Sequence, residues 1–433
     1  MYIMKQGKQR GIMNQNKKWG WGLGLLMMIA GSLAMANGFR NPPAGAEVLG
    51  RVGGKIAQVD DASAVEHNPA NLTEIRDAQV MGAATLIDTS TKFHSPMGAA
   101  STKDDWKFLP NLFVALPSSN HNFTAGLGIT TPFGQSTVWD KTGAFRYTAP
   151  YSAELTLINV NPSIATKLGD KVSVAAGLDV YMSRLDIKQV LPWSLLTKGA
   201  IPDGTAHLQG DGAGVGGNAA VTYHPTKSQS LALTYRSPVK VNYNGDGEFS
   251  GAQAMGMSPS SDFDSAIEFP AIIGFGYGIE LTDTVRLEAD VEWVEFSRYD
   301  SLSLDAGNSN PLLNGTTAPN PRAPLVVRQN WKDAWTLGLG ADWKATESLT
   351  LRAGYIFLQS PVPEEALAPT LPDADQHVFT VGAGIHRGRN RLDVAYGYSL
   401  IGDRQVAQNQ NPAYNGTYET TSQIMSVSYG RSF

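Results

Sequence analysis

Apolar and polar residues alternate along most of the chain after residue 77, and a period of two predicts β-strands. The pattern is sharpest in residues 285–293, where five apolar residues face one way and four charged residues face the other. The apolar face is Val285, Leu287, Ala289, Val291 and Trp293, and the charged face is Arg286, Glu288, Asp290 and Glu292. A soluble sandwich would bury the apolar face, whereas a membrane barrel would turn it toward lipid. The alternation by itself leaves both architectures open.

The length of the alternating runs favours the barrel. Many runs exceed the usual five or six residues of a soluble strand and match the roughly 9–11 residues that cross a membrane at a tilt. The expected strands are residues 77–90, 106–117, 120–131, 152–167, 171–187, 206–224, 229–247, 267–280, 284–304, 326–343, 347–359, 376–387, 389–404 and 417–433. Short turns such as residues 169–170 alternate with long Pro-, Asn- and Ser-rich segments such as 305–325, as in outer-membrane barrels. We therefore predict an all-β protein, a 14-stranded antiparallel transmembrane β-barrel over residues 77–433.

The N-terminus has the organisation of a secretory signal peptide. Residues 1–36 contain basic residues and no acid, then an apolar run that ends in an A-x-A site at residues 34–36. We predict cleavage after Ala36, with either Met1 or Met13 as the true start. A transmembrane anchor is the alternative, but the apolar core is short and interrupted by glycine.

Composition restricts the chemistry. The sequence has no Cys, and its seven His lack the spacing of metal ligands, so we expect neither a metal site nor a cofactor. Acidic residues outnumber basic ones, 39 to 34, which gives no indication of a nucleic-acid partner. No convergent Ser/His or Asp/His group is visible, so we expect that the protein is not an enzyme.

The C-terminal strand resembles an outer-membrane assembly signal. The chain ends at Phe433, preceded on the same strand face by Tyr429, Val427 and Met425, with Arg431 as the one interruption. We expect the barrel-assembly machinery and outer-membrane lipids as partners, and the outer membrane of a Gram-negative bacterium as the location.

Residues 37–76 do not alternate, and they are small, polar and rich in glycine. Because they precede the first strand of a wide barrel, we predict that they form an N-terminal hatch (plug) inside it. A disordered periplasmic tail is the alternative.

Short sequence motifs add a family resemblance. Those in the N-terminal segment are Gly38-Phe39, Gly50-Arg51, Asp60-Asp61-Ala62 and Asn68-Pro69-Ala70. Others follow in order: Thr131-Pro132-Phe133-Gly134, Asn161-Pro162-Ser163, Tyr235-Arg236-Ser237-Pro238-Val239-Lys240, Lys332-Asp333-Ala334 and Ser360-Pro361-Val362-Pro363. Together they resemble the outer-membrane long-chain fatty-acid transporters (FadL type). The resemblance implies a fourteen-stranded barrel with an N-terminal hatch and a kinked third strand that opens the wall sideways.

Two groups of candidate site residues follow. The hatch motif, Asp60, Asp61, Asn68, Pro69 and Ala70, is expected to seat the plug against the wall rather than to catalyse a reaction. A fatty acid also needs a cation for its carboxylate, because an unpaired buried charge is costly. The candidates are Arg184, Lys188, Arg328 and Lys332, with solvated loop or lumen charges as the alternative for each.

The resulting functional hypothesis is a passive channel for long-chain fatty acids or similar hydrophobic small molecules. Family members carry fatty acids or, in other branches, aromatic and aliphatic hydrocarbons, so a hydrocarbon channel of the same fold is an alternative. An outer-membrane barrel lipase or protease is an alternative of another class. A general porin is a further one, but a glycine-rich plug has no use in it.

Overall fold

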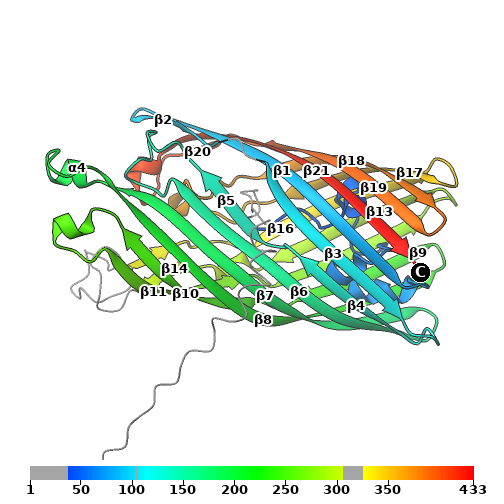
Figure 1. The fold of residues 1–433 in the computed structure, drawn as a ribbon. Coiled ribbons are helices and arrows are strands. Elements are labelled where there is room, and N and C mark those ends of the chain that lie inside the picture. Colours follow the sequence, from blue (N-terminus) through cyan, green and yellow to red (C-terminus); the bar gives the residue numbers. More distant parts are fainter. Residues whose placement is uncertain (1–37, 104–105, 306–324) are drawn as a thin grey trace, which may run out of the picture.

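The computed structural model describes residues 38–103, 106–305 and 325–433, which form a closed antiparallel barrel of 14 strands (Figure 1). Several barrel strands are interrupted, so that two labelled segments make one strand. In chain order the barrel strands are β1 (Gln79–Ser95), β2 with β3 (Gly98–Ser101, Lys107–Pro117), β4 with β5 (Phe123–Thr130, Gly134–Val138), β6 (Ser152–Leu168), β7 (Val172–Leu191), β8 (Gly204–Thr226), β9 with β10 (Gln229–Arg236, Val239–Phe249), β11 with β12 (Ser260–Phe269, Ile272–Glu280), β13 with β14 (Val285–Val294, Ser301–Asp305), β15 with β16 (Leu325–Arg328, Ala334–Lys344), β17 (Leu349–Leu358), β18 (Gln376–Arg387), β19 with β20 (Asn390–Ile401, Arg404–Val406) and β21 (Gly416–Ser432). The first and last strands close the barrel, from Gln79↔Ser432 to His94↔Thr417.

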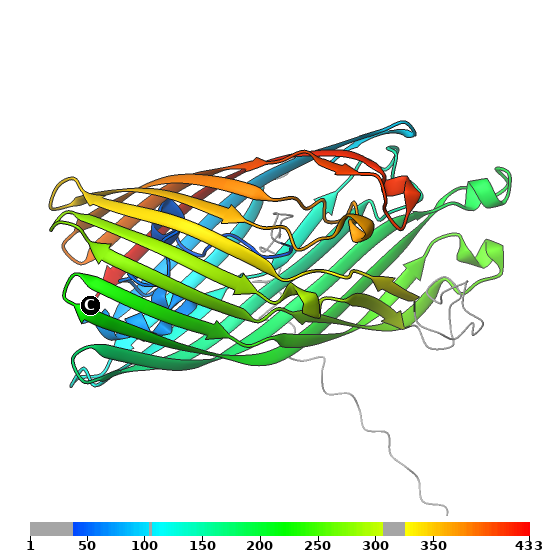
Figure 2. The same ribbon diagram turned by 180° about the vertical axis from the view of Figure 1, so that it is seen from behind.

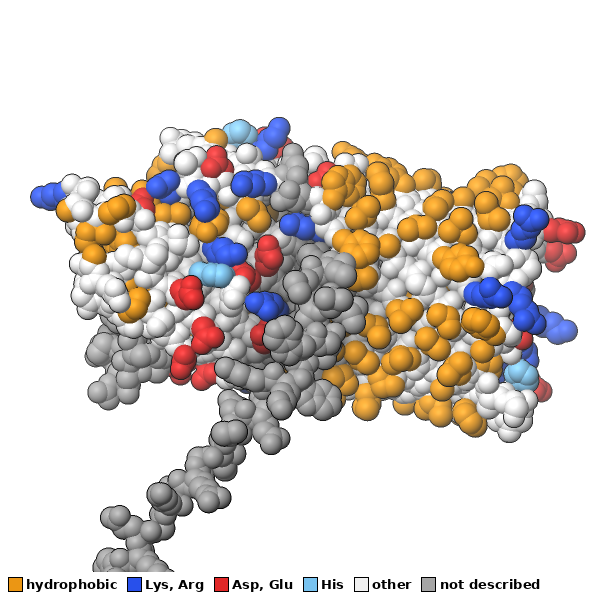
Figure 3. Space-filling view, in the orientation of Figure 1, with side chains coloured by type: hydrophobic (Ala, Val, Ile, Leu, Met, Phe, Trp, Pro, Cys, Tyr) orange, Lys and Arg blue, Asp and Glu red, His pale blue; other side chains and the backbone are white. Residues whose placement is uncertain are grey.

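The charged faces of the strands point into the barrel and the apolar faces point out. In β13, Glu288 is 3% exposed although it is charged, whereas the neighbouring Leu287 is 39% exposed. Figure 3 shows apolar side chains gathered over the half of the barrel nearer the C-terminus. Charged side chains lie over the other half and at the end of the barrel where the chain terminates. This inverted pattern is that of a transmembrane barrel, in which lipid contacts the apolar face. The predicted fold class and strand number are confirmed.

Among the differences from the predicted strand boundaries, two concern β5 and β11. Residues 248–266, which fall between two of the expected strands, include β11, which begins at Ser260. The third barrel strand was expected to end at residue 131, but it resumes as β5 after a break at Thr131-Pro132-Phe133. Local composition hid both, because serine and aspartate dominate the start of β11 and a proline interrupts the third strand.

This break in the third strand leaves a gap in the wall. On one side β6 pairs with both halves, Asn159 with Thr130 and Thr156 with Gly134, so three residues lie opposite two. On the other side β3 pairs with β4 only from Leu112 onward, and residues 107–111 of β3 pair with β1 alone. The wall between the start of β3 and β5 therefore has no ladder of backbone hydrogen bonds.

Residues 38–76, the N-terminal segment, lie inside the barrel near the end where the chain terminates (Figures 1 and 2). The segment contains three short helices, α2 (Ala46–Gly50), α3 (Ala64–His67) and the 3-10 helix η2 (Pro69–Glu74). The predicted signal peptide, residues 1–36, and Asn37 lie outside the described residues. In the part of the chain that the structure describes, no helix is both long and apolar enough to cross a membrane.

The remaining short helices occur in strand breaks and in the long connections at the opposite end (Figure 2). They are α4 (Trp193–Leu196) and the 3-10 helices η3 (Ala252–Met255), η4 (Phe296–Arg298), η5 (Glu364–Ala366) and η6 (Pro412–Tyr414). Residues 306–324, within one of the expected long loops, also lie outside the described part of the chain.

Candidate functional site

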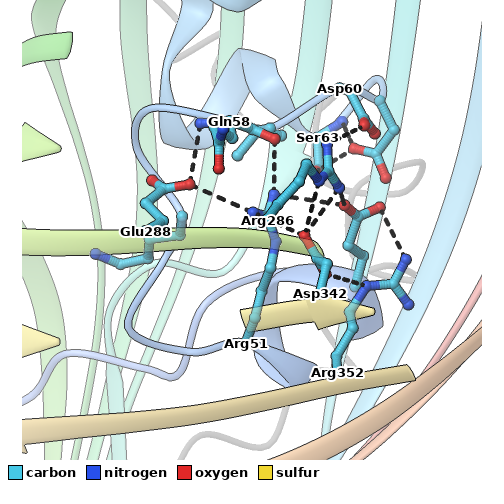
Figure 4. A network of polar contacts seen from close by, with 12 residues as sticks. Arg51, Gln58, Asp60, Ser63, Arg286, Glu288, Asp342 and Arg352 are labelled. Carbon is cyan, nitrogen blue, oxygen red and sulfur yellow. Dashed lines mark hydrogen bonds and ion pairs between the residues drawn. The ribbon is translucent and has the colours of Figure 1, made fainter. Parts of the chain in front are cut away.

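A network of buried charges fixes the N-terminal segment to the barrel wall (Figure 4). At its centre, Arg51 Nη1 lies 3.3 Å from Glu288 Oε2 and 3.3 Å from Asp342 Oδ2, and both acids come from strands. The segment contributes Glu47, Arg51, Asp60 and Asp61, and the strands contribute Arg286, Glu288, Asp342, Arg352, Arg391 and Asp393. Buried charges are tolerated only when paired, so removal of one partner should be costly.

A loop of the segment is held by backbone hydrogen bonds to two strand carboxylates. Glu288 accepts hydrogen bonds from the backbone N–H groups of Ile56 (2.7 Å), Gln58 (3.1 Å) and Ala57. Asp290 accepts one from the N–H of Lys55 at 2.6 Å. Four successive N–H groups thus bind acids of β13, and this fixes the path of residues 55–58.

The hatch motif makes the contacts that a seating role requires. Asn68 Nδ2 lies 2.8 Å from Ile56 O within the segment and 2.8 Å from Thr222 Oγ1 on β8 of the wall. Its Oδ1 accepts a hydrogen bond from Ala70 N, and Pro69 begins η2, where its missing N–H costs nothing. These contacts join the triplet to the rest of the segment and to β8, and its seating role stays a prediction.

Asp60 and Asp61 differ in their surroundings. Asp60 binds Arg286 Nη1 at 2.8 Å and Arg391 Nη1 at 3.2 Å, and so joins the segment to β13 and β19. Asp61 caps its own turn, because its Oδ1 accepts a hydrogen bond from Ser63 N at 2.9 Å. Burial raises the pKa of Asp61 to about 6.

The first described residues of the segment hold the break in the third strand. Gly134 N donates to Phe39 O at 2.8 Å, Asn41 N donates to Pro132 O at 2.9 Å, and Asn41 Nδ2 donates to Thr131 O at 2.8 Å. The ring of Phe39 is surrounded by five aromatic rings at centroid distances of 5.2 to 5.8 Å. These rings belong to Phe133, Phe269, Phe296, Tyr299 and Trp331. Sequence reasoning matched Gly38-Phe39 to a family pattern but did not identify this role.

Phe39 also lines a cavity of about 430 Å³ in the half of the barrel that carries the long connections, here called the outer cavity. Its wall is mainly aliphatic and aromatic, with side chains such as Leu185, Leu208 and Phe249. Among the described residues that line it, Glu154 is the single charged residue, and none is Lys, Arg or His. The outer cavity can therefore take an apolar chain but has no cation for a carboxylate.

A second cavity of about 110 Å³, the inner cavity, lies between the N-terminal segment and the wall. Its charged lining consists of Arg40, Lys55, Glu66, Arg236 and Glu292. His67 also lines it, and burial lowers the pKa of this imidazole to about 3, so it is neutral. Residues 130–133 around the strand break form part of the same wall.

The four bases proposed from the sequence lie elsewhere. Arg184 lies 3.8 Å from Asp211 and Lys188 lies 3.3 Å from Asp186, on the face of β7 opposite Leu185. Arg328 and Lys332 are exposed. The structure does not bring the four together, and none lines either cavity. That these four bases bind a carboxylate inside the barrel stays a prediction, and this geometry does not support it.

Comparisons with known proteins agree with this architecture. Residues 26–433 match the family described as outer membrane protein transport protein (OMPP1/FadL/TodX). The chain is 26% identical over 436 residues to the long-chain fatty acid transport protein of Escherichia coli K12, covering 90% of this chain and 93% of that one. A Pseudomonas aeruginosa FadL homologue superposes with a TM-score of 0.79 at 20% identity, covering 92% of this chain and all of the other. The Pseudomonas putida toluene transporter TodX gives a TM-score of 0.68 at 18% identity over 91% of this chain. At these identities the solved structures establish the fold.

Proposed function

This chain belongs to the OMPP1/FadL/TodX family of outer membrane transport proteins, and we propose that it is a passive channel for long-chain fatty acids or similar hydrophobic molecules. The observation that carries the proposal is an apolar cavity inside the barrel that is lined by Phe39, which in turn bonds to the strand break beside a gap in the wall. A water-filled porin has no use for an apolar cavity or for a lumen occupied by a tightly bound segment.

The proposed route begins at the end with the long connections, which is the extracellular end of outer-membrane barrels. An apolar chain entering the outer cavity leaves water and gains about 0.8 kcal/mol per buried methylene. From there it passes the Phe39 region and leaves sideways between β3 and β5 into the membrane. Transfer of an apolar chain into lipid in this way needs no energy source in the protein.

We also propose that residues 37–76 act as the hatch of this channel. The paired charges around Arg51 and the N–H bonds to Glu288 support a firmly seated plug. The residues nearest the strand break are held by three hydrogen bonds to that break, by the ring contacts of Phe39 and by the ion pair of Arg40 with Glu292. Passage of cargo beside the strand break therefore requires these contacts to open.

Uncharged hydrocarbons are a second candidate cargo. The relatives include both a long-chain fatty acid transport protein and a toluene transporter. The absence of a base among the described residues of the outer cavity favours neutral molecules there. The alternative of a lipase or protease has no comparable support, because the family is one of transport proteins.

A liposome assay tests the proposal. Purified protein is reconstituted, and the influx of labelled oleate is compared with that of labelled sucrose. We expect oleate influx above that of protein-free vesicles and no sucrose influx. Sucrose influx alone would identify a porin and overturn the proposal.

The side exit can be tested with paired cysteines, because the chain contains no Cys. Asn111 Oδ1 accepts a hydrogen bond from Thr131 N at 3.2 Å at the edge of the gap, so Asn111→Cys with Thr131→Cys can bridge it. Oxidation should lower oleate influx severalfold, and reduction should restore it. The matched control, Thr85→Cys with Ser426→Cys, joins two side chains across the β1–β21 seam, where the ladder is continuous. Equal effects of both disulfides would exclude the gap as the exit.

A further inference from the structure

The inner cavity holds an excess of positive charge at one point. Arg40 and Lys55, both from the N-terminal segment, converge on a single carboxylate, Glu292 of β13. Arg40 Nη2 lies 2.8 Å from Glu292 Oε1, Arg40 Nη1 lies 3.1 Å from Oε2, and Lys55 Nζ lies 2.5 Å from the same Oε2. Two cations therefore share one anion in a site that is largely shielded from water.

The other charged groups that line the inner cavity do not cancel this excess. Arg236, the third cation of the cavity, is already paired with Asp179 at 2.8 Å and with Glu66 at 3.2 Å. His67 is neutral, because burial lowers the pKa of its imidazole. Burial also raises the pKa of Glu66, and its carboxyl group is already paired with Arg236.

Lys55 has donor capacity to spare. Its ammonium carries three N–H donors, and Glu292 is its one ion-pair partner in the described part of the chain. The residue is only 5% exposed and lines the inner cavity, so a ligand in that cavity can reach the remaining donors. A buried ammonium with unused donors, on the wall of a cavity, is suited to a second carboxylate.

We propose that Arg40 and Lys55, which share Glu292 as their present partner, form a carboxylate-binding station in the inner cavity, where the head group of an acidic lipid is held while its chain passes the strand break. The inference rests on the proposed channel function and specifies its substrate class as long-chain carboxylic acids. It assigns the carboxylate to the hatch rather than to the strand bases Arg184 and Lys188.

The position of the station along the route supports this assignment. Phe39 lines the outer cavity, and the next residue, Arg40, lines the inner one. A carboxylate in the outer cavity meets no cation among the described residues, so the first available partner is Arg40. Residues 130–133 share the inner cavity wall, which places the chain of a bound acid beside the gap between β3 and β5.

The test compares two cargos that differ only in the head group, oleate and oleyl alcohol, in liposomes containing the full-length mature protein. Arg40→Gln and Lys55→Gln should each lower oleate influx at least about tenfold, because a hydrogen bond to a charged group is lost. Influx of oleyl alcohol should change less than twofold. Lys227→Gln, an exposed cation in the β8–β9 turn that lines neither cavity, is the matched control and should affect neither cargo.

A variant that is expected to strengthen oleate binding distinguishes the proposal from a general loss of folding. Glu292→Gln removes the competing anion, so oleate binding measured by fluorescence displacement should tighten while binding of the alcohol stays unchanged. Heat-modifiable mobility confirms the folded barrel in each variant. A structural role alone would lower both cargos together in all three variants, and that result would overturn the station.

The failure of the station and the failure of the channel are distinguishable. If the wild-type protein carries neither cargo, the proposed function itself is wrong. If it carries both and the variants do not discriminate between acid and alcohol, the channel stands and the station is wrong.

Discussion

Replacement of Gly53 by alanine tests how closely the N-terminal segment must approach the wall. An ideal Cβ at this position would lie 2.1 Å from Leu339 N and 2.2 Å from Tyr355 O, both backbone atoms of β16 and β17. Ordinary contact begins near 3.4 Å, so the added carbon lacks more than 1 Å of space. Because the two strands are held in a continuous ladder, the segment rather than the wall has to move.

The displacement reaches the loop that follows. The N–H groups of Lys55, Ile56 and Gln58 lie 2.6, 2.7 and 3.1 Å from carboxylate oxygens of β13, and a shift of 1 Å takes them beyond hydrogen-bonding distance. Hydrogen bonds to charged groups contribute about 1.5–3 kcal/mol each. Loss of even two of these three bonds corresponds to about 4 kcal/mol, or roughly a thousandfold change in the equilibrium for release of the loop.

Hydrogen exchange followed by mass spectrometry measures that equilibrium directly. In Gly53→Ala, amides of residues 51–58 should lose about a thousandfold of their protection, and sucrose leakage should increase, while the barrel stays heat-modifiable. Gly82→Ala is the control, because a Cβ there meets no atom within 4 Å. Wild-type protection in Gly53→Ala would refute the argument that close backbone contact seats the segment.

Four further predictions concern targeting, assembly and the hatch. Mass spectrometry of the mature protein should show cleavage between Ala36 and Asn37; a retained apolar segment would contradict secretion to the outer membrane. Deletion of Phe433 should lower the amount of heat-modifiable barrel in outer-membrane fractions, because the last strand must be recognised and then pair with β1. Deletion of residues 37–66 should reduce lipid uptake or increase sucrose leakage, and wild-type values for both with a folded barrel would exclude a hatch. Burial raises the pKa of Asp61 to about 6, above the value near 3.9 expected after release, so the Asp61 carboxyl favours docking as the pH falls from 7 to 5, whereas His67, whose pKa burial lowers to about 3, opposes docking over the same range. Asp61→Asn should remove the Asp61 contribution, so that exchange protection of the segment decreases more from pH 7 to 5 than in the wild type, and an unchanged pH profile would count against it.

The sequence determined the barrel because its pattern is local. A strand that faces lipid on one side and a polar lumen on the other must alternate apolar and polar residues. Residues 285–293 show this alternation by themselves, without information from any other part of the chain. The number of strands followed from counting such runs, and the terminal aromatic face of residues 425–433 followed in the same way. The break in the third strand could be predicted only from the family resemblance. The local sequence around a proline is the same whether the proline lies in an edge strand, a bulge or a loop.

The tertiary structure alone decided the site. Arg40 and Lys55 are 15 positions apart in the segment and far in sequence from Glu292, so only the folded barrel brings their charges to one point. Alternation also did not show whether Arg184 and Lys188 point into the lumen. A period of two shows that a strand has two faces, but not which face points inward when both carry polar and apolar residues. The polar face of β7 near its end turned out to lie outside, with Leu185 toward the cavity. Which charges are buried, paired or available to a carboxylate depends on distances between strands and plug, and no local pattern contains those distances.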